Sequence, residues 1–495
     1  MGLVREAAIS FFFGTTAQAD AFTAAWTLPV TIYDLLINGA ISAALVPVFS
    51  EYAERDDQEL WRIVSSMINV MLFVMTCVIG LMIWQAPLVT TLLVQETASN
   101  LRPLTMQLVQ MLLPSLLFMG LAGLMTAVLF AQRSFLLPAF SAAVFNIGII
   151  LGVVLLHEPL GIVSLAVGVL FGSVTQVALQ VWGLRRMRYQ LRLELHHPAI
   201  RRMLWLYAPV ALGVAFSVCG TLIDRRLASG FPGALAMMRY ATTLIQFPLG
   251  LVAAAVSMAV LPTLSRMDAN NEQQAFREML GMGLKVVILL VLPAAMGLAA
   301  IAQPVTALVF EHGEFTAQDT MITAWALLLY LPSLPAAAID QLLIFASYAR
   351  KNTLMPNLVQ GAAVGIYLVT ALSLVSWTQL GFLGLVLGNS AQWIGHALLM
   401  AWLVHRAVSL RGLRLGEAFG KALLASVLMA LAVYAVVSVA LPLLLPGVSA
   451  LVQIGIAAVL GAVVYGGLSM LLRVEALGFF MLALRQKLGR KAVER

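Results

Sequence analysis

Four arginines and five carboxylates that lie within, or at the outer edge of, the long apolar stretches of this sequence could do chemistry. They are Arg5, Glu6, Asp20, Asp34, Asp224, Arg225, Arg226, Arg239 and Asp340. A charge near the centre of a bilayer costs roughly 2.5–3.5 kcal/mol on insertion scales, so such residues normally face a cavity and mark a transport path. Arginine remains charged there, and its planar fork of donors matches phosphate oxygens. We therefore expect a cationic cavity for an anionic, phosphorylated cargo.

The arginines differ in their depth within the expected spans. Arg5 lies about nine residues from the end of its helix, near mid-depth, and cannot easily reach the interface. Arg225, Arg226 and Arg239 lie closer to helix ends, where a guanidinium can also extend to the headgroups. The predicted substrate-binding residues are Arg5, Asp20, Arg225, Arg226 and Arg239.

The carboxylates allow a functional and a structural interpretation. Asp20 and Asp224 would hold arginines in the empty state or bind a coupling cation, with Asp224 as the candidate for ion coupling. A structural ion pair is the alternative for both. Asp34 and Asp340 have no evident partner in the sequence, so they are interpreted as polar contacts inside helices.

Sequence motifs for catalysis are missing. The chain has no GxxxxGK[ST] phosphate loop, no HExxH pair, no nucleophile elbow and no paired catalytic carboxylates. Its two cysteines stand alone. We therefore expect no enzyme, no metal site and no cofactor, but a transporter driven by a monovalent cation or by the membrane potential.

Composition identifies the elements that must position these charges. Of 495 residues, 61% are hydrophobic and 10% are charged, and the mean hydropathy is +0.97, which is too apolar for a soluble domain. Runs of about 20 apolar residues span a bilayer. The expected spans are 3–13, 21–49, 62–86, 104–130, 136–156, 159–184, 204–229, 236–263, 279–302, 320–346, 355–377, 380–404, 418–445 and 449–473. Because the first is too short, we expect its helix to begin upstream of Met1 or to be half-length.

Basic residues predict the orientation. Of the 29 lysines and arginines, 24 follow even-numbered spans, in the loops after these spans or in the C-terminal tail. Positive residues concentrate on the cytoplasmic side, so both termini are expected there. The excess of positive charge is then explained by topology and by anionic lipid headgroups, and no nucleic-acid partner is expected.

An internal repeat predicts the architecture. Similar residues recur at offsets of about 215–220 positions, for example Gly161 and Gly168 with Gly381 and Gly388. Six spans separate the copies, so both run in the same direction through the membrane. We predict an all-α polytopic membrane protein of about 14 transmembrane helices. Two parallel six-helix lobes, 1–203 and 204–410, would surround a central cavity, and 411–495 would add two helices and a basic cytoplasmic tail.

Two GxxxG pairs are predicted to pack helices together. They are Gly168 with Gly172 and Gly361 with Gly365. Small residues one turn apart allow two helix backbones to approach closely.

Short motifs across the first twelve spans resemble a known family. They are Gly2-Leu3-Val4-Arg5-Glu6, Phe13-Gly14, Ala19-Asp20-Ala21-Phe22, Leu28-Pro29, Asn38-Gly39-Ala40, Val46-Pro47, Arg133 to Phe140, Asn146, Asp224-Arg225, Ala228-Ser229, Tyr240-Ala241, Phe247-Pro248-Leu249-Gly250, Leu261-Pro262-Thr263-Leu264-Ser265-Arg266, Gly313-Glu314-Phe315-Thr316 and Tyr348-Ala349-Arg350. With these residues the chain resembles the MurJ/MviN lipid II flippases of the multidrug/oligosaccharidyl-lipid/polysaccharide exporter (MOP) superfamily.

The resemblance implies a function in bacterial cell-wall biogenesis. It implies alternating access in the plasma (inner) membrane and flipping of undecaprenyl-pyrophosphate-linked peptidoglycan precursor, lipid II, to the outer leaflet. The last two spans would form a groove for the lipid tail, and cell-wall synthesis proteins would be partners. Arg5 and Asp20 fall on cavity positions of the family, and Asp224 falls on a position proposed to bind sodium in some members.

The sequence departs from the family pattern at three places. Tyr33-Asp34 stands where the second span usually has an arginine. Thr242-Thr243 replaces an Asn/Asp-Arg pair, with Arg239 one turn earlier, and Tyr367 and Ala371 replace polar residues of the sodium site. These departures leave two alternatives open: a flippase for another polyprenol-linked saccharide and a transport-inactive scaffold. A cation-coupled drug exporter is a further alternative, which a cavity rich in arginine disfavours because it repels cationic drugs.

Overall fold

The computed structural model describes residues 1–35, 44–185, 189–191, 194, 197–250, 260, 263–264, 266–267, 272–350, 352, 354–444 and 447–475. Within these ranges the chain is helical and contains no strand, which confirms the predicted all-α fold class. The contacts divide the chain into two compact units. Unit 1 comprises Met1–Arg239 with His312–Thr316, and unit 2 comprises Tyr240–Glu311 with Ala317–Arg495.

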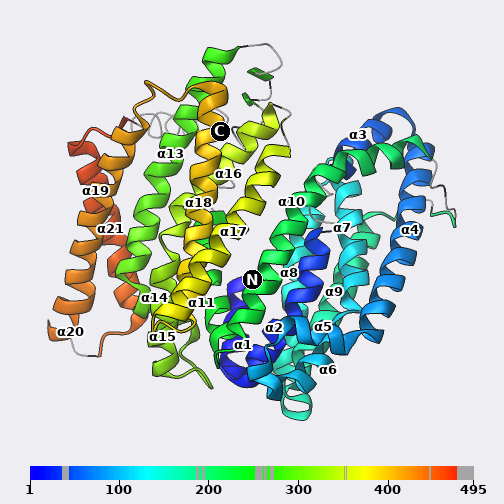
Figure 1. Ribbon diagram of the computed structural model, residues 1–495, viewed down its shortest axis with the longest axis horizontal. Coiled ribbons are helices and arrows are strands. Elements are labelled where there is room, and N and C mark those ends of the chain that lie inside the picture. Colours follow the sequence, from blue (N-terminus) through cyan, green and yellow to red (C-terminus); the bar gives the residue numbers. More distant parts are fainter. Residues whose placement is uncertain are drawn as a thin grey trace, which may run out of the picture. The chain divides into compact units, whose positions relative to one another are not determined.

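Unit 1 is a bundle of helices (Figure 1). Its helices are α1 (Gly2–Phe13), α2 (Ala17–Tyr33), α3 (Val46–Arg55), α4 (Asp57–Trp84), α5 (Ala86–Leu93), the 3-10 helix η3 (Glu96–Leu101), α6 (Arg102–Leu112), α7 (Ser115–Ala131), α8 (Leu136–Leu160), α9 (Val163–Gly183), α10 (Pro198–Ala228) and the start of α11 (Ala234–Leu249). Local capping sets several starts. For example, the Asp56 carboxylate accepts hydrogen bonds from the amides of Gln58 (2.8 Å) and Glu59 (3.3 Å) at the first turn of α4.

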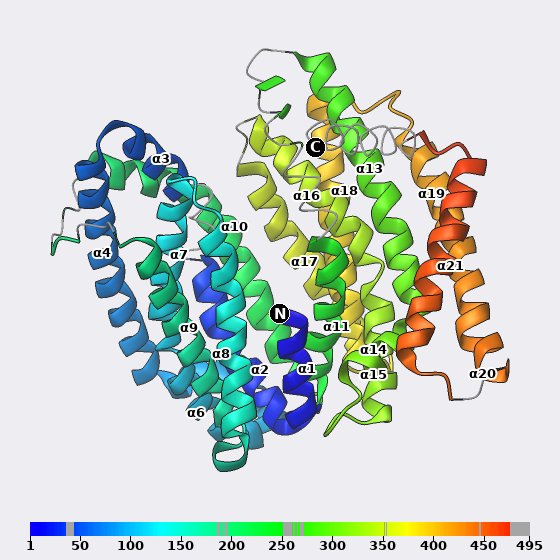
Figure 2. The same ribbon diagram turned by 180° about the vertical axis from the view of Figure 1, so that it is seen from behind.

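Unit 2 is also a helical bundle, seen from both sides in Figures 1 and 2. It contains the end of α11, then α13 (Gln273–Ala300), α14 (Ala302–Phe310), α15 (Ala317–Tyr330), α16 (Ser333–Ala349), α17 (Leu354–Trp377), α18 (Leu383–Val408), α19 (Leu415–Tyr434), the π-helix η5 (Ala435–Ala440), α20 (Leu441–Leu444) and α21 (Ala450–Leu471). Helix α17 packs along α18, and α13 packs against both α16 and α19.

Each of the fourteen predicted spans contains at least one described helix. Seven of the described helices are long and apolar enough to cross a membrane, and ten spans result when each of three bent helix pairs is taken as one. The remaining four predicted spans correspond to α1, α2, α11 and α18. The first three have only 12, 17 and 16 residues, and α18 carries Asn389, Gln392 and His396 within its apolar sequence.

The internal repeat is visible in the local geometry of the two units. The bend between α6 and α7 is 41°, and the bend between α15 and α16 is 42°. A serine follows each bend: Ser115 Oγ donates to the Leu112 carbonyl, and Ser333 Oγ donates to the Tyr330 carbonyl, both at 2.6 Å. The copies therefore share backbone conformation and hydrogen bonding as well as sequence.

Two glycines of the repeat also share their backbone conformation. Gly161 ends α8 with φ 53°, and Gly381 follows α17 with φ 57°. Both values lie in the left-handed region, which glycine adopts without a steric penalty.

Small residues on α8 and α9 allow these two helices to pack closely. A Cβ atom built on Gly172 would lie 2.6 Å from the Phe145 carbonyl oxygen, and one built on Gly168 would lie 3.0 Å from the Ile149 Cα. The predicted packing role of this GxxxG pair is therefore confirmed. For Gly365 the prediction is wrong, because a Cβ atom there would meet nothing within 4 Å.

The boundary between units 1 and 2 differs from the predicted boundary between the two lobes. Helix α10, which begins the second predicted lobe, packs within unit 1 against α2 and α5. The predicted boundaries at 203 and 410 stay predictions. Several residues named above lie outside the described residues: Asn38, Gly39, Ala40, Leu261, Pro262, Ser265 and the part of the basic tail beyond position 475.

Candidate functional site

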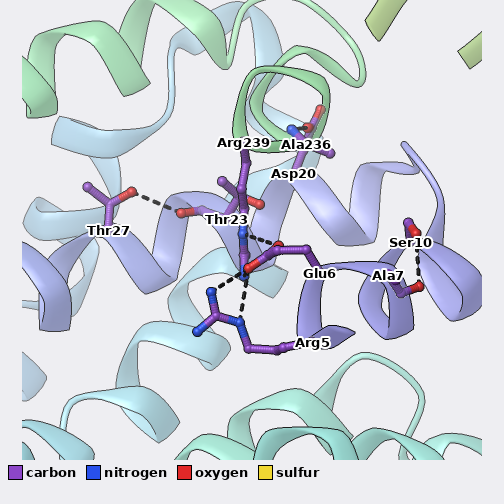
Figure 3. Close-up of polar contacts among 9 residues, drawn as sticks. All are labelled: Arg5, Glu6, Ala7, Ser10, Asp20, Thr23, Thr27, Ala236 and Arg239. Carbon is purple, nitrogen blue, oxygen red and sulfur yellow. Dashed lines mark hydrogen bonds and ion pairs between the residues drawn. The ribbon is translucent and has the colours of Figure 1, made fainter. Parts of the chain in front are cut away.

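A buried carboxylate among the predicted intramembrane charges of unit 1, that of Glu6, lies between two arginines (Figure 3). Glu6 Oε1 accepts hydrogen bonds from Arg5 Nε (3.0 Å) and Nη2 (2.5 Å), and from Arg239 Nη2 (2.9 Å). Glu6 Oε2 lies 2.8 Å from Arg239 Nε. The structure thus brings together two predicted substrate-binding residues that are 234 positions apart in the sequence, Arg5 and Arg239.

The charges of this cluster do not cancel. Two guanidinium groups and one carboxylate leave a formal charge of +1. The Glu6 side chain is 1% exposed, whereas those of Arg5 and Arg239 are 21% and 12% exposed. The carboxylate is therefore covered, and the two cations keep accessible surface for a further anion.

An aromatic ring of α2 supports Arg239. The guanidinium carbon of Arg239 lies 5.3 Å from the centroid of the Phe22 ring, which is within the range of a cation–π contact. Phe22 is itself buried, so the ring presents a fixed face to the cation.

Threonines of α2 donate their hydroxyl hydrogen bonds to backbone carbonyls of the same helix. Thr27 Oγ1 donates to the Thr23 carbonyl at 2.9 Å, as Figure 3 shows, and Thr31 Oγ1 donates to the Thr27 carbonyl at 2.8 Å. The hydroxyl donors of Thr27 and Thr31 therefore have their acceptors within α2.

Asp20 positions the helix that carries Arg239. Its carboxylate accepts hydrogen bonds from the amides of Gly233 (2.6 Å) and Ala236 (2.9 Å) at the start of α11. Amides of the first helical turn have no partner within their own helix, and a carboxylate there also interacts favourably with the helix dipole. The contacts thus give Asp20 a capping role, and its predicted contact with substrate stays a prediction.

The other predicted residues of α10 have different contacts. Arg225 Nη1 lies 3.8 Å from Asp224 Oδ2, so these neighbours pair with each other. Arg226 Nη1 donates to the carbonyl of Thr91 in the last turn of α5. Nearby, Ser229 Oγ accepts a hydrogen bond of 3.0 Å from the Gln95 amide. Arg226 thereby ties the end of α10 to the end of α5, and its predicted binding role stays a prediction.

Asp340 has a partner that the sequence did not indicate. Its Oδ1 lies 2.8 Å from His396 Nδ1, and the two side chains are 1% and 4% exposed. The pair joins α16 to α18 within unit 2. Asp34 ends α2 as its C-cap residue.

The sequence did not reveal two residues of the arginine cluster: Glu6, which bridges the arginines, and Phe22, which packs against Arg239. It also did not reveal His396 as the partner of Asp340. Glu6 was visible as an intramembrane charge next to Arg5, and this adjacency was the available signal. Phe22 lies two residues after Asp20, but an apolar ring in an apolar helix carries no signal by itself. For His396, the signal is a lone histidine in an apolar run.

Comparison with known proteins gives a consistent result. The sequence profile of the family described as lipid II flippase MurJ matches residues 9–455. A lipid II flippase MurJ of Burkholderia cenocepacia is 29% identical over 388 residues, which cover 75% of this chain and 74% of that protein. A probable lipid II flippase MurJ of Rhizobium meliloti is 27% identical over 454 residues, covering 88% of this chain and 83% of its own.

Solved structures share the fold. A lipid II flippase MurJ in an inward closed conformation matches with a TM-score of 0.80 and 24% identity, covering 95% of this chain and 96% of its own. An inward-facing multidrug resistance transporter of the MATE family, from the MOP superfamily, matches with a TM-score of 0.70 and 13% identity, covering 84% of this chain and 95% of its own. At these identities the likeness concerns the fold.

Proposed function

Because the chain belongs to the lipid II flippase MurJ family, we propose that it moves lipid II from the cytoplasmic to the outer leaflet of the bacterial inner membrane. Transport would proceed by alternating access, with both termini in the cytoplasm. The observation that carries this proposal within the chain is the Arg5–Glu6–Arg239 cluster, whose formal charge of +1 suits an anionic headgroup. Cell-wall synthesis proteins stay the predicted protein partners.

The pyrophosphate of lipid II is the part of the cargo that the cluster would bind. Each guanidinium offers several donors in a plane, and only some of them contact Glu6. In the empty state Glu6 holds both side chains in place, which lowers the entropic cost of ordering them when the cargo arrives. When pyrophosphate arrives, it competes with Glu6 for the same donors. A carboxylate in the site therefore supports release as well as binding.

The remaining charged residues would have supporting roles. Asp20 would hold α11 so that Arg239 stays opposite Glu6, and Asp224 would remain the candidate for a coupling cation. An inside-negative membrane potential would favour outward movement of a negative headgroup by about 2.3 kcal/mol per charge per 100 mV.

Complementation tests the proposal. Cells depleted of their own flippase should be rescued by the wild-type chain and by Arg133→Ala, since Arg133 is an exposed arginine paired with Glu54 outside the cluster. Arg5→Ala and Arg239→Ala should fail to rescue at equal expression. Rescue by both alanine variants would refute the role of the cluster, and failure of the well-expressed wild-type chain would refute the function.

One observation favours a related cargo as the second candidate. On α11, Thr242-Thr243 stands where the family usually has an Asn/Asp-Arg pair. These threonines lie about one turn after Arg239. A different pattern of donors here suits a different polyprenol-linked saccharide. Native mass spectrometry of lipid that co-purifies with the protein distinguishes the two cargoes by mass.

A further inference from the structure

Unit 2 contains a titratable pair that the proposed substrate binding does not use. Asp340 of α16 and His396 of α18 lie 2.8 Å apart, and both side chains are almost completely covered. Their helices lie in expected membrane spans, where Asp and His side chains are characteristic of proton pathways. We propose that Asp340 and His396 form a proton-binding site, and that the proton they exchange is coupled to the bend between α15 and α16.

The pair stands apart from other charges of the helices packed around it. On α16 and α17 the other titratable side chains are Tyr348 and Tyr367. On α13 the nearest basic residue to the membrane interior is Lys285, and its Nζ lies 2.5 Å from Glu475 Oε2. Helix α15 contributes Asp319 in its first turn and Tyr330 at its end. The last turn of α18 contains His405 and Arg406. Among the described residues, Asp340 and His396 are thus the acid and base that contact each other in this part of unit 2.

A structural tie between helices does not require ionisable groups. In unit 1, Gln180 of α9 donates hydrogen bonds to Thr126 Oγ1 of α7 and to Ser141 Oγ of α8, both at 2.9 Å. Helices α7 and α9 are the repeat counterparts of α16 and α18, and the position that corresponds to Asp340 through the repeat offset of 218 is Ala122. Buried ion pairs are often no more stabilising than neutral replacements. The charged pair in unit 2 therefore indicates a function that the neutral tie in unit 1 lacks.

The pair is placed where it can act on a bend. Helices α15 and α16 meet at 42°, and Ser390 Oγ of α18 donates a hydrogen bond of 2.6 Å to the Leu329 carbonyl in the last turn of α15. Helix α18 thus holds α15 through Ser390 and α16 through His396. The contact of Ser390 is a neutral hydrogen bond, whereas the contact of His396 with Asp340 changes with the protonation of the two side chains.

The proton cycle follows from the chemistry of the two groups. With one shared proton, the pair is neutral overall and its ionic form is aspartate with imidazolium. Uptake of one more proton by the carboxylate gives a carboxylic acid beside an imidazolium, which removes the charge attraction and leaves a net charge of +1. Release of that proton restores the tie between α16 and α18. One proton is bound and one is released in each cycle.

Infrared difference spectroscopy of the full chain in lipid tests proton binding without requiring transport. Stepping the bulk from roughly pH 8 to pH 5 spans the range in which histidine and perturbed carboxylates titrate. We expect a carbonyl band of a protonated carboxyl group that disappears in Asp340→Asn. In His396→Gln, the band should appear at a different pH. Ser390→Ala, which removes the neutral tie on the same helix, should keep the band. A spectrum unchanged in both Asp340→Asn and His396→Gln would overturn the site.

The coupling rests on the proposed function and needs a second measurement. In liposomes containing lipid II, an imposed pH gradient should change the initial flipping rate of the wild-type chain several-fold, and this dependence should vanish in Asp340→Asn and His396→Gln. Ser390→Ala should retain it. Flipping with equal pH dependence in all of these proteins would overturn the coupling. A titrating Asp340 band without lipid II flipping at any pH would instead support the proton site and refute the proposed function.

Discussion

The carboxylate of Asp20 accepts a 2.6 Å hydrogen bond from the amide of Gly233, although 213 residues separate the two in the sequence. Gly233 has φ 73° and precedes the first residue of α11. Through this contact, α2 fixes the start of the helix whose second turn carries Arg239. The position of an arginine in the candidate site thus depends on a carboxylate that does not touch it.

Asp20→Ala should destabilise the protein and impair transport together. It removes the partner of two buried amides, and each hydrogen bond to a charged group contributes about 1.5–3 kcal/mol. We expect a lower midpoint of thermal unfolding in detergent and loss of complementation. Asp20→Asn keeps one acceptor oxygen and should lie between wild type and Asp20→Ala in both measurements. Equal stability of all three proteins would contradict the capping role.

Glu6→Gln should strengthen anion binding while slowing transport. The formal charge of the Arg5–Glu6–Arg239 cluster rises from +1 to +2, and the competitor for the guanidinium donors is weakened. Isothermal titration of the purified variant with inorganic pyrophosphate should show higher affinity than wild type, and flipping in liposomes should be slower because release is impeded. Weaker pyrophosphate binding by this variant, measured on folded protein, would argue that Glu6 contributes to the anion site itself.

Phe22→Leu should weaken the support of Arg239. The cation–π contact is expected to contribute about 0.5–2 kcal/mol, in addition to the packing of the ring. Phe49→Leu provides the matched control, because Phe49 is a fully buried phenylalanine of unit 1. The variants should lose similar packing energy, but only Phe22→Leu should reduce pyrophosphate affinity. Equal affinities in the two variants would remove Phe22 from the site.

The two GxxxG pairs should respond oppositely to alanine. Gly172→Ala places a Cβ against the Phe145 carbonyl, and overpacking of this kind typically costs about 1–3 kcal/mol. Gly365→Ala meets open space and should stabilise its helix by up to about 1 kcal/mol through helix propensity. Thermal unfolding of the single variants in the same detergent measures both effects. A destabilising Gly365→Ala would mean that this glycine packs against a partner.

Much of the fold could be predicted from the sequence because the bilayer imposes a simple length requirement. Apolar runs of this length predict helices, and their order and the repeat predict two lobes, whose boundaries stay predictions. Short helices such as α5 and α14 were not predicted as separate elements. They lie at the edges of apolar runs, and only a change in the direction of the backbone separates them from the preceding helix. Bends such as those before Ser115 and Ser333 likewise arise from packing and hydrogen bonding between turns.

The candidate site was predictable only in part. Arg5 and Arg239 were identified because intramembrane arginines are rare, but no local pattern pairs Arg239 with a carboxylate 233 positions earlier. Arg225 and Arg226 are both predicted substrate-binding residues. The contact of Arg226 with the Thr91 carbonyl depends on where α5 ends in space, which is tertiary information. The partner of Asp340 is hidden for the same reason, because α17 lies between the two helices in the sequence.

The separation of Glu6 from Arg239 also constrains the order of assembly. As the chain is synthesised, α1 enters the membrane with Glu6 paired only to its neighbour Arg5, and Arg239 follows only after α2 to α10 have been made. The cap from Asp20 must likewise wait for Gly233. Helices α1 and α2, which are short and carry charges, thus reach their final polar contacts late. Completion of unit 1 is therefore a post-insertion step, in which the nascent protein has to keep its first two helices available until α11 arrives.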